Sequence, residues 1–541
     1  MEKKKEILVI VGSLLVIILS VTLAYFTVQI IGKGKDISLD SANLKITFAS
    51  GGGNISSTNI EPGWSSGAST FTVKNESKDT YKYNIIIKDL VNTFVTKGFL
   101  VYKITSTDGG YNMSDFVDVP KSTSATDTIL AYSVEIAKGV THTYTVEFKY
   151  LTSEEDQSDD MGRILSGTLY IEKGTDKPLT LAEKLLEDNP TIQTRGSFSA
   201  VFTTTNTGTL YKATESIAGS TSKDVYYFAG DAKNNWVKFG TYKINGPIRG
   251  YYSSISISYR EYASMEECAS ASSYNYNCSY TWSAGDDIYW RIIRTNHDGS
   301  IRLLYSGTAT DTTSGYIGIS KFNSRYRDAL YVGYMYGTSG TLASNRTNEN
   351  DSTIKTYIDA WYSSYLNSYT KYISTEAVYC NDREVGSGKY SATGSVFSYA
   401  PETRLYTNNA PSYNCANSKD AFSGSNTEAK LTYPIGLMTA DEITYAGGLI
   451  QKKLTSPYAW YCLNSAGSSI TDIYWWLLSP LIWDGNGARS SRVSGSSEPG
   501  TLSSWDADGI SGVRPAISIK GDALYSSGDG SPENPYEIVY N

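Results

Sequence analysis

An uncharged apolar run near the N-terminus determines the compartment in which the rest of this chain folds. It covers about 25 residues, Ile7 to Ile31, enough for a helix to cross the roughly 30 Å hydrocarbon core of a bilayer. The preceding "MEKKKE" contributes three lysines, which keep that end in the cytoplasm. We therefore expect residues 1–33 to be a signal or membrane-anchor segment, retained or cleaved near Ala24, with the remainder outside the cytoplasm. A buried core helix is the alternative, but the run has no polar face.

The cysteines fit an oxidising compartment. Cys268 and Cys278 lie close together in a segment rich in tyrosine and serine, and Cys380 and Cys415 bracket a second excursion. We expect each pair to form a disulfide that ties an insertion to its scaffold. Cys462 is left over, and we expect it to be a buried thiol that acts as a small apolar side chain rather than a nucleophile.

Length, charge and composition exclude several classes of protein. A chain of 541 residues implies two to four domains. The net charge is -8 and no basic stripe is present, so we expect no nucleic-acid partner. The two histidines, His142 and His297, are far apart, and the common hydrolase, metalloprotease and nucleotide-binding motifs do not occur. We therefore expect no catalytic residue, no metal ligand and no cofactor, and hence no enzyme.

Short alternating stretches follow the apolar run and predict an antiparallel β-sandwich over residues 34–175. Three of them, "AYFT", "SANLKITF" and "NIEPGWSSGASTFTVKNESKDTYKYNI", resemble the TasA/camelysin family of Gram-positive surface and fibre proteins. The resemblance implies a jelly-roll-like module, exported by a dedicated signal peptidase and able to serve as a structural fibre or matrix subunit. An immunoglobulin-like spacer of unrelated origin is the alternative.

Residues 176–224 are predicted to be a linker with one short helix, "LAEKLLEDNP", which ends at Pro190. A larger domain is expected over 225–541. Within it, "DIYWRIIRTNHDGSIRLLYSG" has the form of a β-hairpin with His297 in its turn. Apolar and aromatic residues at three- and four-residue steps predict a core-packed helix over 351–373. Thr439 with Glu442 forms a capping box that begins another helix.

The end of the chain carries a second resemblance. The order "WWLLSP", "ARSSRV", a long polar segment and "GVRPAISI" resembles the C-type-lectin-like fold of bacterial surface proteins. It is also similar to the variable proteins diversified by diversity-generating retroelements, and distantly to the formylglycine-generating enzyme fold. The resemblance implies that the Arg514 side chain is buried and holds the end of the domain in place. It also implies that residues of the loop between the two flanking strands can vary without loss of the fold.

That loop is soft, polar and punctuated by glycine between Ser494 and Ala516, and we expect it to contact a ligand. Its mixture of aromatic anchors and adaptable polar groups is typical of antibody-like binding surfaces. The expected ligand-binding residues are Trp483, Asp484, Arg489, Ser491, Arg492, Ser494, Glu498, Ser503, Ser504, Trp505, Asp506, Asp508 and Ile510.

Three alternatives to this interpretation remain open. In the first, the loop is simply exposed to solvent and has no binding role. In the second, Glu498-Pro499 and Trp505-Asp506 echo a calcium-dependent carbohydrate motif, although Gly500 removes one Ca²⁺ ligand. In the third, the protein is an enzyme of the formylglycine-generating type. Such enzymes use a pair of cysteines, whereas Cys462 is the one cysteine in this part of the sequence.

The sequence thus predicts a mostly β chain with some helix, in which a β-sandwich precedes a C-type-lectin-like α+β domain. The expected function is ligand binding at a bacterial cell surface, in the manner of an adhesin or receptor, with a TasA-type fibre subunit as the alternative. The expected partners are a protein or glycan on another cell or surface and the membrane, through residues 7–31. The protein is expected to be anchored to the bacterial membrane or secreted to the cell surface.

Overall fold

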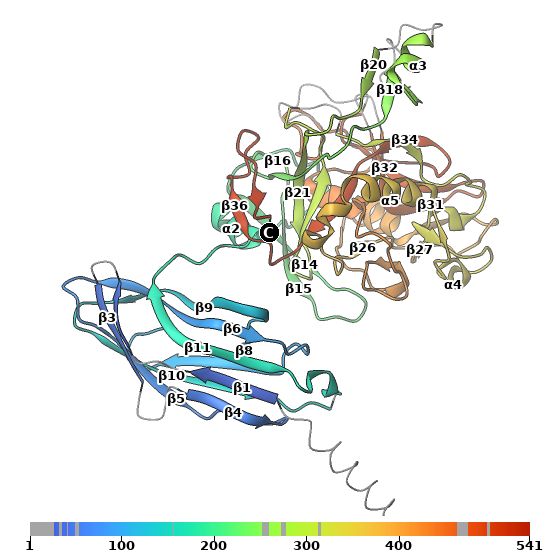
Figure 1. Cartoon of the computed structure of the whole chain (residues 1–541). Helices are drawn as coiled ribbons and strands as arrows, with labels where there is room; N and C mark the ends of the chain where they lie inside the picture. The colour runs from blue at the N-terminus through green and yellow to red at the C-terminus, as the bar shows by residue number, and fades with distance from the viewer. Residues whose placement is uncertain are drawn as a thin grey trace, which may run out of the picture. The chain divides into compact units, whose positions relative to one another are not determined.

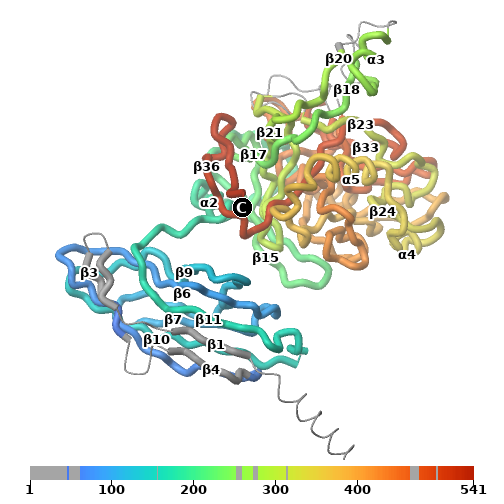
Figure 2. Tube along the Cα trace, viewed as in Figure 1, coloured from blue at the N-terminus to red at the C-terminus, as the bar shows by residue number. Residues whose placement is uncertain are grey.

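A computed structural model describes residues 26–31, 35–39, 42–48, 54–154, 156–251, 259–271, 277–311, 315–462, 474–494 and 498–540. The chain forms two compact units, Met1–Lys177 and Pro178–Asn541, which Figures 1 and 2 follow from end to end. Strands in mainly antiparallel sheets dominate both, with a few short helices, so the expected mostly β fold is confirmed. Within the described ranges, no helix has the length and hydropathy to span a membrane.

The first strand of the first unit begins inside the segment that was predicted to be the membrane anchor. Its residues 7–25 lie outside the described part of the chain, but Phe26–Ile31 form strand β1, which pairs with β11 (Ile164–Lys173) and β4 (Asn54–Ile60). The predicted anchor boundary at residue 33 is therefore wrong, because an apolar strand that directly follows an apolar run is indistinguishable from it by hydropathy.

Two sheets build the first unit. Their strand orders are β4-β1-β11-β6-β9 and β2-β3-β5-β10-β7-β8. The remaining bounds are Lys35–Leu39 (β2), Ala42–Phe48 (β3), Ser69–Asn75 (β5), Tyr81–Asn92 (β6), Leu100–Ser106 (β7), Val117–Asp118 (β8), Ser122–Ile136 (β9) and Thr141–Tyr150 (β10). Every second residue of β10 is buried, and its Tyr144 and Phe148 share one apolar core with Ile85 and Ile87 of the other sheet. This period of two makes the unit a β-sandwich.

His142 of β10 belongs to the same core. It is 4% exposed, and its Nδ1 lies 3.0 Å from the Tyr83 hydroxyl. Burial lowers the pKa of His142, so the ring is neutral at pH 7 and serves as a core polar group.

The second unit begins at Pro178, so residues 178–224 are not the predicted linker. Helix α2 (Leu181–Asp188) has a capping box of Thr180 and Glu183, and it buries Leu181 and Leu185 in the main core. Strand β14 (Thr209–Glu215) then pairs with β15 (Lys223–Tyr227). A short helix with only two core leucines carries too weak a pattern to reveal its domain from sequence.

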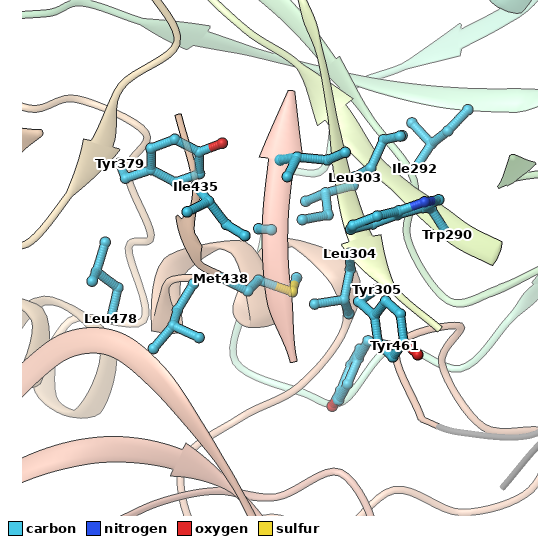
Figure 3. Close-up of a cluster of buried hydrophobic side chains, with 14 of the residues drawn as sticks. Trp290, Ile292, Leu303, Leu304, Tyr305, Tyr379, Ile435, Met438, Tyr461 and Leu478 are labelled. Atoms are coloured by element: carbon cyan, nitrogen blue, oxygen red, sulfur yellow. The ribbon is translucent and has the colours of Figure 1, made fainter. Parts of the chain in front are cut away.

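The main sheet of this unit has the order β12-β14-β15-β21-β22-β35-β30, with β17 also paired to β21. The new bounds are Thr191–Gln193 (β12), Trp236–Thr241 (β17), Asp287–Thr295 (β21), Ile301–Tyr305 (β22), Gly436–Leu437 (β30) and Pro515–Ile519 (β35). The predicted hairpin is β21–β22, whose turn places Gly299 at φ 83°. Figure 3 shows Trp290, Leu303 and Met438 gathered in the core beside this sheet.

Two predicted helices are present. The first is α5 (Thr353–Tyr365), continued by a 3-10 turn over Asn367–Tyr372, and it buries Ile354, Ile358 and Trp361. The second is α7 (Ala440–Ala446), which has the predicted Thr439–Glu442 capping box.

The second unit also contains several small elements. They are β13 (Thr205–Asn206), β16 (Asp231–Ala232), β24 (Met335–Tyr336), β25 (Asn350–Asp351), β26 (Tyr379–Cys380), β29 (Ala421–Phe422), β36 (Tyr525–Ser527), β37 (Glu537–Ile538), α4 (Leu342–Asn345) and α6 (Ala400–Glu402).

Both predicted disulfides are confirmed. Cys268–Cys278 lies in an arm made of β18 (Ile248–Tyr251), β19 (Tyr259–Tyr262), β20 (Asn277–Tyr280) and α3 (Met265–Ser270), which stands out from the second unit in Figure 1. Cys380–Cys415 ties β26 to the segment before β29. Two such bonds are typical of an oxidising, extracytoplasmic environment.

Cys462 is a buried free thiol. Burial raises its pKa to about 12, so the sulfur is protonated at neutral pH and is a poor nucleophile.

Candidate ligand-binding surface

The region predicted to be a free loop contains strands of a sheet. Strand β31 (Trp475–Trp483) is buried on both faces and pairs with β32 (Ala488–Val493), which pairs in turn with β33 (Leu502–Asp506). Strand β34 (Ile510–Val513) lies between β31 and β23 (Gly318–Lys321), and β28 (Phe397–Tyr399) and β27 (Val385–Ser387) complete the order. Within the predicted loop, the stretches Leu502–Asp506 and Ile510–Val513 are strands instead, because polar side chains conceal strands whose pairing depends on distant segments.

Four of the predicted contact residues are buried and cannot meet a ligand as the surface stands. Trp483, Ser491, Arg492 and Ser494 are 2%, 1%, 9% and 3% exposed. The Trp483 indole packs against Phe397 and donates from Nε1 to the carbonyl of Gly394 at 3.1 Å. The apolar side chain identified as an anchor is thus part of the core.

Six of the predicted residues are exposed or half-buried, and they lie in or beside the turns that follow β31 and β33. We call this set the Trp505 surface; its members are Asp484, Arg489, Trp505, Asp506, Asp508 and Ile510. Trp505 is 49% exposed and Ile510 is 62% exposed, so two large apolar side chains reach solvent on either side of one turn. The turn that joins them is closed by the Gly509 amide, which donates to the Asp506 carbonyl at 2.8 Å.

Two residues, Arg492 and Gly509, lie against the Trp505 ring. The Arg492 guanidinium lies between two rings, 4.2 Å from the centroid of Trp505 and 3.9 Å from that of Tyr474. Gly509 lies against the same ring, since a Cβ added to it would stand 1.8 Å from Cδ1 of Trp505. Arg492 and Gly509 therefore set the position of the indole before any ligand arrives, which lowers the entropic cost of binding.

Arg489 is fixed by two carboxylates. Its Nη2 lies 2.8 Å from Oδ2 of Asp484, and its Nε lies 3.2 Å from Oδ1 of Asp506. Burial alone would raise the pKa of Asp484, but the amides of Asn486 and Gly487 and the Arg489 guanidinium lower it. The three charged side chains form a polar border to the exposed indole.

The other predicted residues lie further along the ribbon. Glu498 is exposed, and Ser503 and Ser504 are half-buried on β33. The Ser503 hydroxyl lies 3.3 Å from that of Ser494. No group of three or more histidine, cysteine or acidic side chains able to hold a metal ion occurs in the described ranges, and Asp506 faces Arg489 instead.

Sequence reasoning missed Tyr474 and Gly509. Neither could be found from a local pattern, because Tyr474 reaches Arg492 only through strand pairing and Gly509 acts through the space it leaves. The sequence did indicate that Arg514 is a buried structural residue. Its side chain is 1% exposed and donates to the carbonyls of Tyr305 and Tyr461.

His297 lies in the predicted turn, beside a pocket of about 440 Å³ that Glu215 and Glu376 help to line. Its Nε2 is 2.8 Å from the Thr221 carbonyl and 3.1 Å from the Ser220 hydroxyl. These contacts engage Nε2 and hold the ring against the Ser220–Thr221 segment.

No model of a known protein family matches the sequence, and no curated protein is significantly similar to it.

Proposed function

We propose that this chain is a bacterial cell-surface binding protein whose second unit contacts a protein or glycan ligand through the Trp505 surface. The observation that carries the proposal is the exposed, prepositioned indole of Trp505 beside the exposed Ile510. Trp is enriched among the few residues that carry most of the binding energy of an interface, where its ring packs into a pocket of the partner.

The scaffold supports the same function. The strands beneath the surface are buried, with Trp476, Leu477 and Leu478 of β31 fully enclosed. Substitutions on the outer side of β33 and in the following turn therefore cost little stability, while the ends stay fixed. This is the arrangement that the C-type-lectin-like resemblance implies.

The N-terminal run supplies the attachment in this proposal. Since β1 begins at Phe26, cleavage near Ala24 would release a complete sandwich, whereas retention of the run would anchor it. In either case the first unit serves as a spacer between the cell and the second unit.

The direct test is capture of cells by the purified, fluorescently labelled protein in flow cytometry, with cells from the community in which the source bacterium lives. Trp505→Ser should reduce capture about 30-fold, the effect of losing a hot spot of about 2 kcal/mol. Gly509→Ala, which displaces the ring without removing it, should reduce capture in the same direction.

Matched controls are Tyr406→Ser, an equally accessible ring at 52% exposure, and Gly196→Ala, where an added Cβ meets nothing within 4 Å. Both should leave capture unchanged. Undiminished capture by Trp505→Ser would refute the proposed surface.

Diversification of this surface is tested by deep sequencing of codons 475–516 from a population of the source bacterium. We expect substitutions confined to adenine positions in the codons of accessible residues such as Asp508 and Ile510, with Trp483, Ser491 and Arg514 unchanged. An invariant set of codons would argue for a fixed ligand rather than a diversified receptor.

The second candidate function is a fibre or matrix subunit. The observation that favours it is the edge strand β9, whose stretch Ser122–Thr128 is exposed at the border of the five-stranded sheet. Unpaired edges can add strands from other chains. Filaments that form with rising protein concentration in electron micrographs would support this function, and a concentration-independent monomer would exclude it.

A further inference from the structure

A segment with three basic residues borders the Trp505 surface. Lys321 of β23 stands opposite Ile510 in the strand pairing. Further along, the Asn323 amide donates to the Ala507 carbonyl at 2.8 Å, and the Tyr326 carbonyl accepts from the Ala488 amide at 2.8 Å. We call Lys321, Arg325 and Arg327 the basic strip.

The charges of the basic strip are not neutralised by the protein. The Arg325 guanidinium meets only the hydroxyl of Tyr331, at 3.4 Å, and Arg327 meets only that of Tyr326, at 3.3 Å. Neither arginine forms an ion pair with the described residues, and neither does Lys321. Both arginines are exposed and Lys321 is half-buried.

The other cations of the region are already engaged. Arg489 is shared by two aspartates, and Arg492 is stacked between two rings. The positive potential available to a partner therefore comes from the basic strip. This concentration of free positive charge stands out on a chain whose net charge is -8, because such a patch selects and orients an oppositely charged partner.

We propose that the Trp505 surface binds an acidic segment of a protein partner, in which carboxylates meet the basic strip and an apolar side chain packs on Trp505 and Ile510. The inference rests on the proposed function and names the chemistry of its ligand. A protein fits better than a glycan because Ile510, the most exposed apolar side chain of the pair, offers an aliphatic contact that only another apolar side chain uses well.

The test uses the full chain and defined probes in fluorescence anisotropy. The probes are a labelled glutamate-rich peptide that contains phenylalanine, the same peptide with lysine for glutamate, and heparin as an anionic polysaccharide. We expect the acidic peptide to bind, the basic peptide not to bind, and affinity to fall as salt rises. The variant Lys321→Glu/Arg325→Glu/Arg327→Glu should bind the acidic peptide at least about tenfold more weakly.

The control variant, Lys138→Glu/Lys243→Glu/Lys430→Glu, makes the same change of net charge at exposed lysines elsewhere and should bind as the unchanged protein does. Equal binding by the basic-strip variant would overturn the inference. Binding of heparin alone, with the same dependence on the basic strip, would also overturn it and indicate an anionic glycan.

Cell capture separates this inference from the proposed function. Loss of capture by both Trp505→Ser and the basic-strip variant supports both. Loss by Trp505→Ser alone leaves the proposed function standing and overturns the acidic partner, whereas capture retained by both variants overturns both.

Discussion

Replacing Glu442 by glutamine should lower the free energy of unfolding of the second unit by about 3–5 kcal/mol, the usual cost of breaking a buried ion pair from one side. Glu442 is 1% exposed, and its Oε1 lies 2.9 Å from Nε of Arg294 and 2.9 Å from Nη1 of Arg302. Among the described residues, Glu215, which is bonded to Arg294, would be the one carboxylate left paired with these two guanidinium groups. The neutral amide would leave Arg302 buried without a carboxylate.

Urea unfolding followed by tryptophan fluorescence measures the effect on the correct unit. Trp64 is the only one of the chain's 10 tryptophans that precedes Pro178. The matched control is Glu183→Gln, since Glu183 occupies the same capping-box position of α2 but is only half-buried. We expect it to cost about 1 kcal/mol or less, and equal losses for the two variants would contradict the role given to the buried arginines.

The same variant should change the pH dependence of stability. Burial alone would raise the pKa of Glu442, but the attraction of Arg302 and Arg294 outweighs it and holds the pKa below its ordinary value. A carboxyl group with a lowered pKa stabilises the fold above its unfolded pKa of about 4.3, and this contribution is lost as the pH falls through the folded pKa. The difference between the unchanged protein and Glu442→Gln should therefore be full at pH 7 and shrink below about pH 4.

Replacing Arg514 by alanine should cost about 3–5 kcal/mol, because it removes buried hydrogen bonds and leaves a cavity. The guanidinium donates to the Tyr305 carbonyl at 3.1 and 3.2 Å and to the Tyr461 carbonyl at 2.6 Å. It also lies over the ring of Trp475, 4.8 Å from its centroid. The Arg514 side chain thus connects β22 of the main sheet to β31, the strand that pairs with β32 beneath the Trp505 surface.

Thermal and urea unfolding of three variants checks this assignment. Arg514→Lys keeps the charge but cannot reach both carbonyls, so its loss should be intermediate. Arg260→Ala, an exposed arginine of β19, should change stability by no more than about 0.5 kcal/mol. A loss for Arg514→Ala as small as that of Arg260→Ala would show that the tie contributes little.

Local patterns in the sequence determined a good part of this fold. The strands of the sandwich follow from their alternation, and the helix at 440–446 follows from its capping box, since both depend on neighbours in the chain. The two disulfides followed from cysteine spacing and the compartment. The turn residues around the Trp505 surface were visible as well, because glycine and aspartate mark turns in a sequence.

Only the tertiary structure decided which residues of that segment face water. Trp483 and Trp505 have the same side chain and lie in the same region, yet one is 2% and the other 49% exposed. The difference arises because both faces of β31 are covered, whereas the outer side of β33 is open. The partners of Glu442 were equally hidden, since Arg294 and Arg302 lie more than a hundred residues away and meet it only across the folded sheet. Sequence alone determined what each segment can form; packing between distant segments determined what each side chain does.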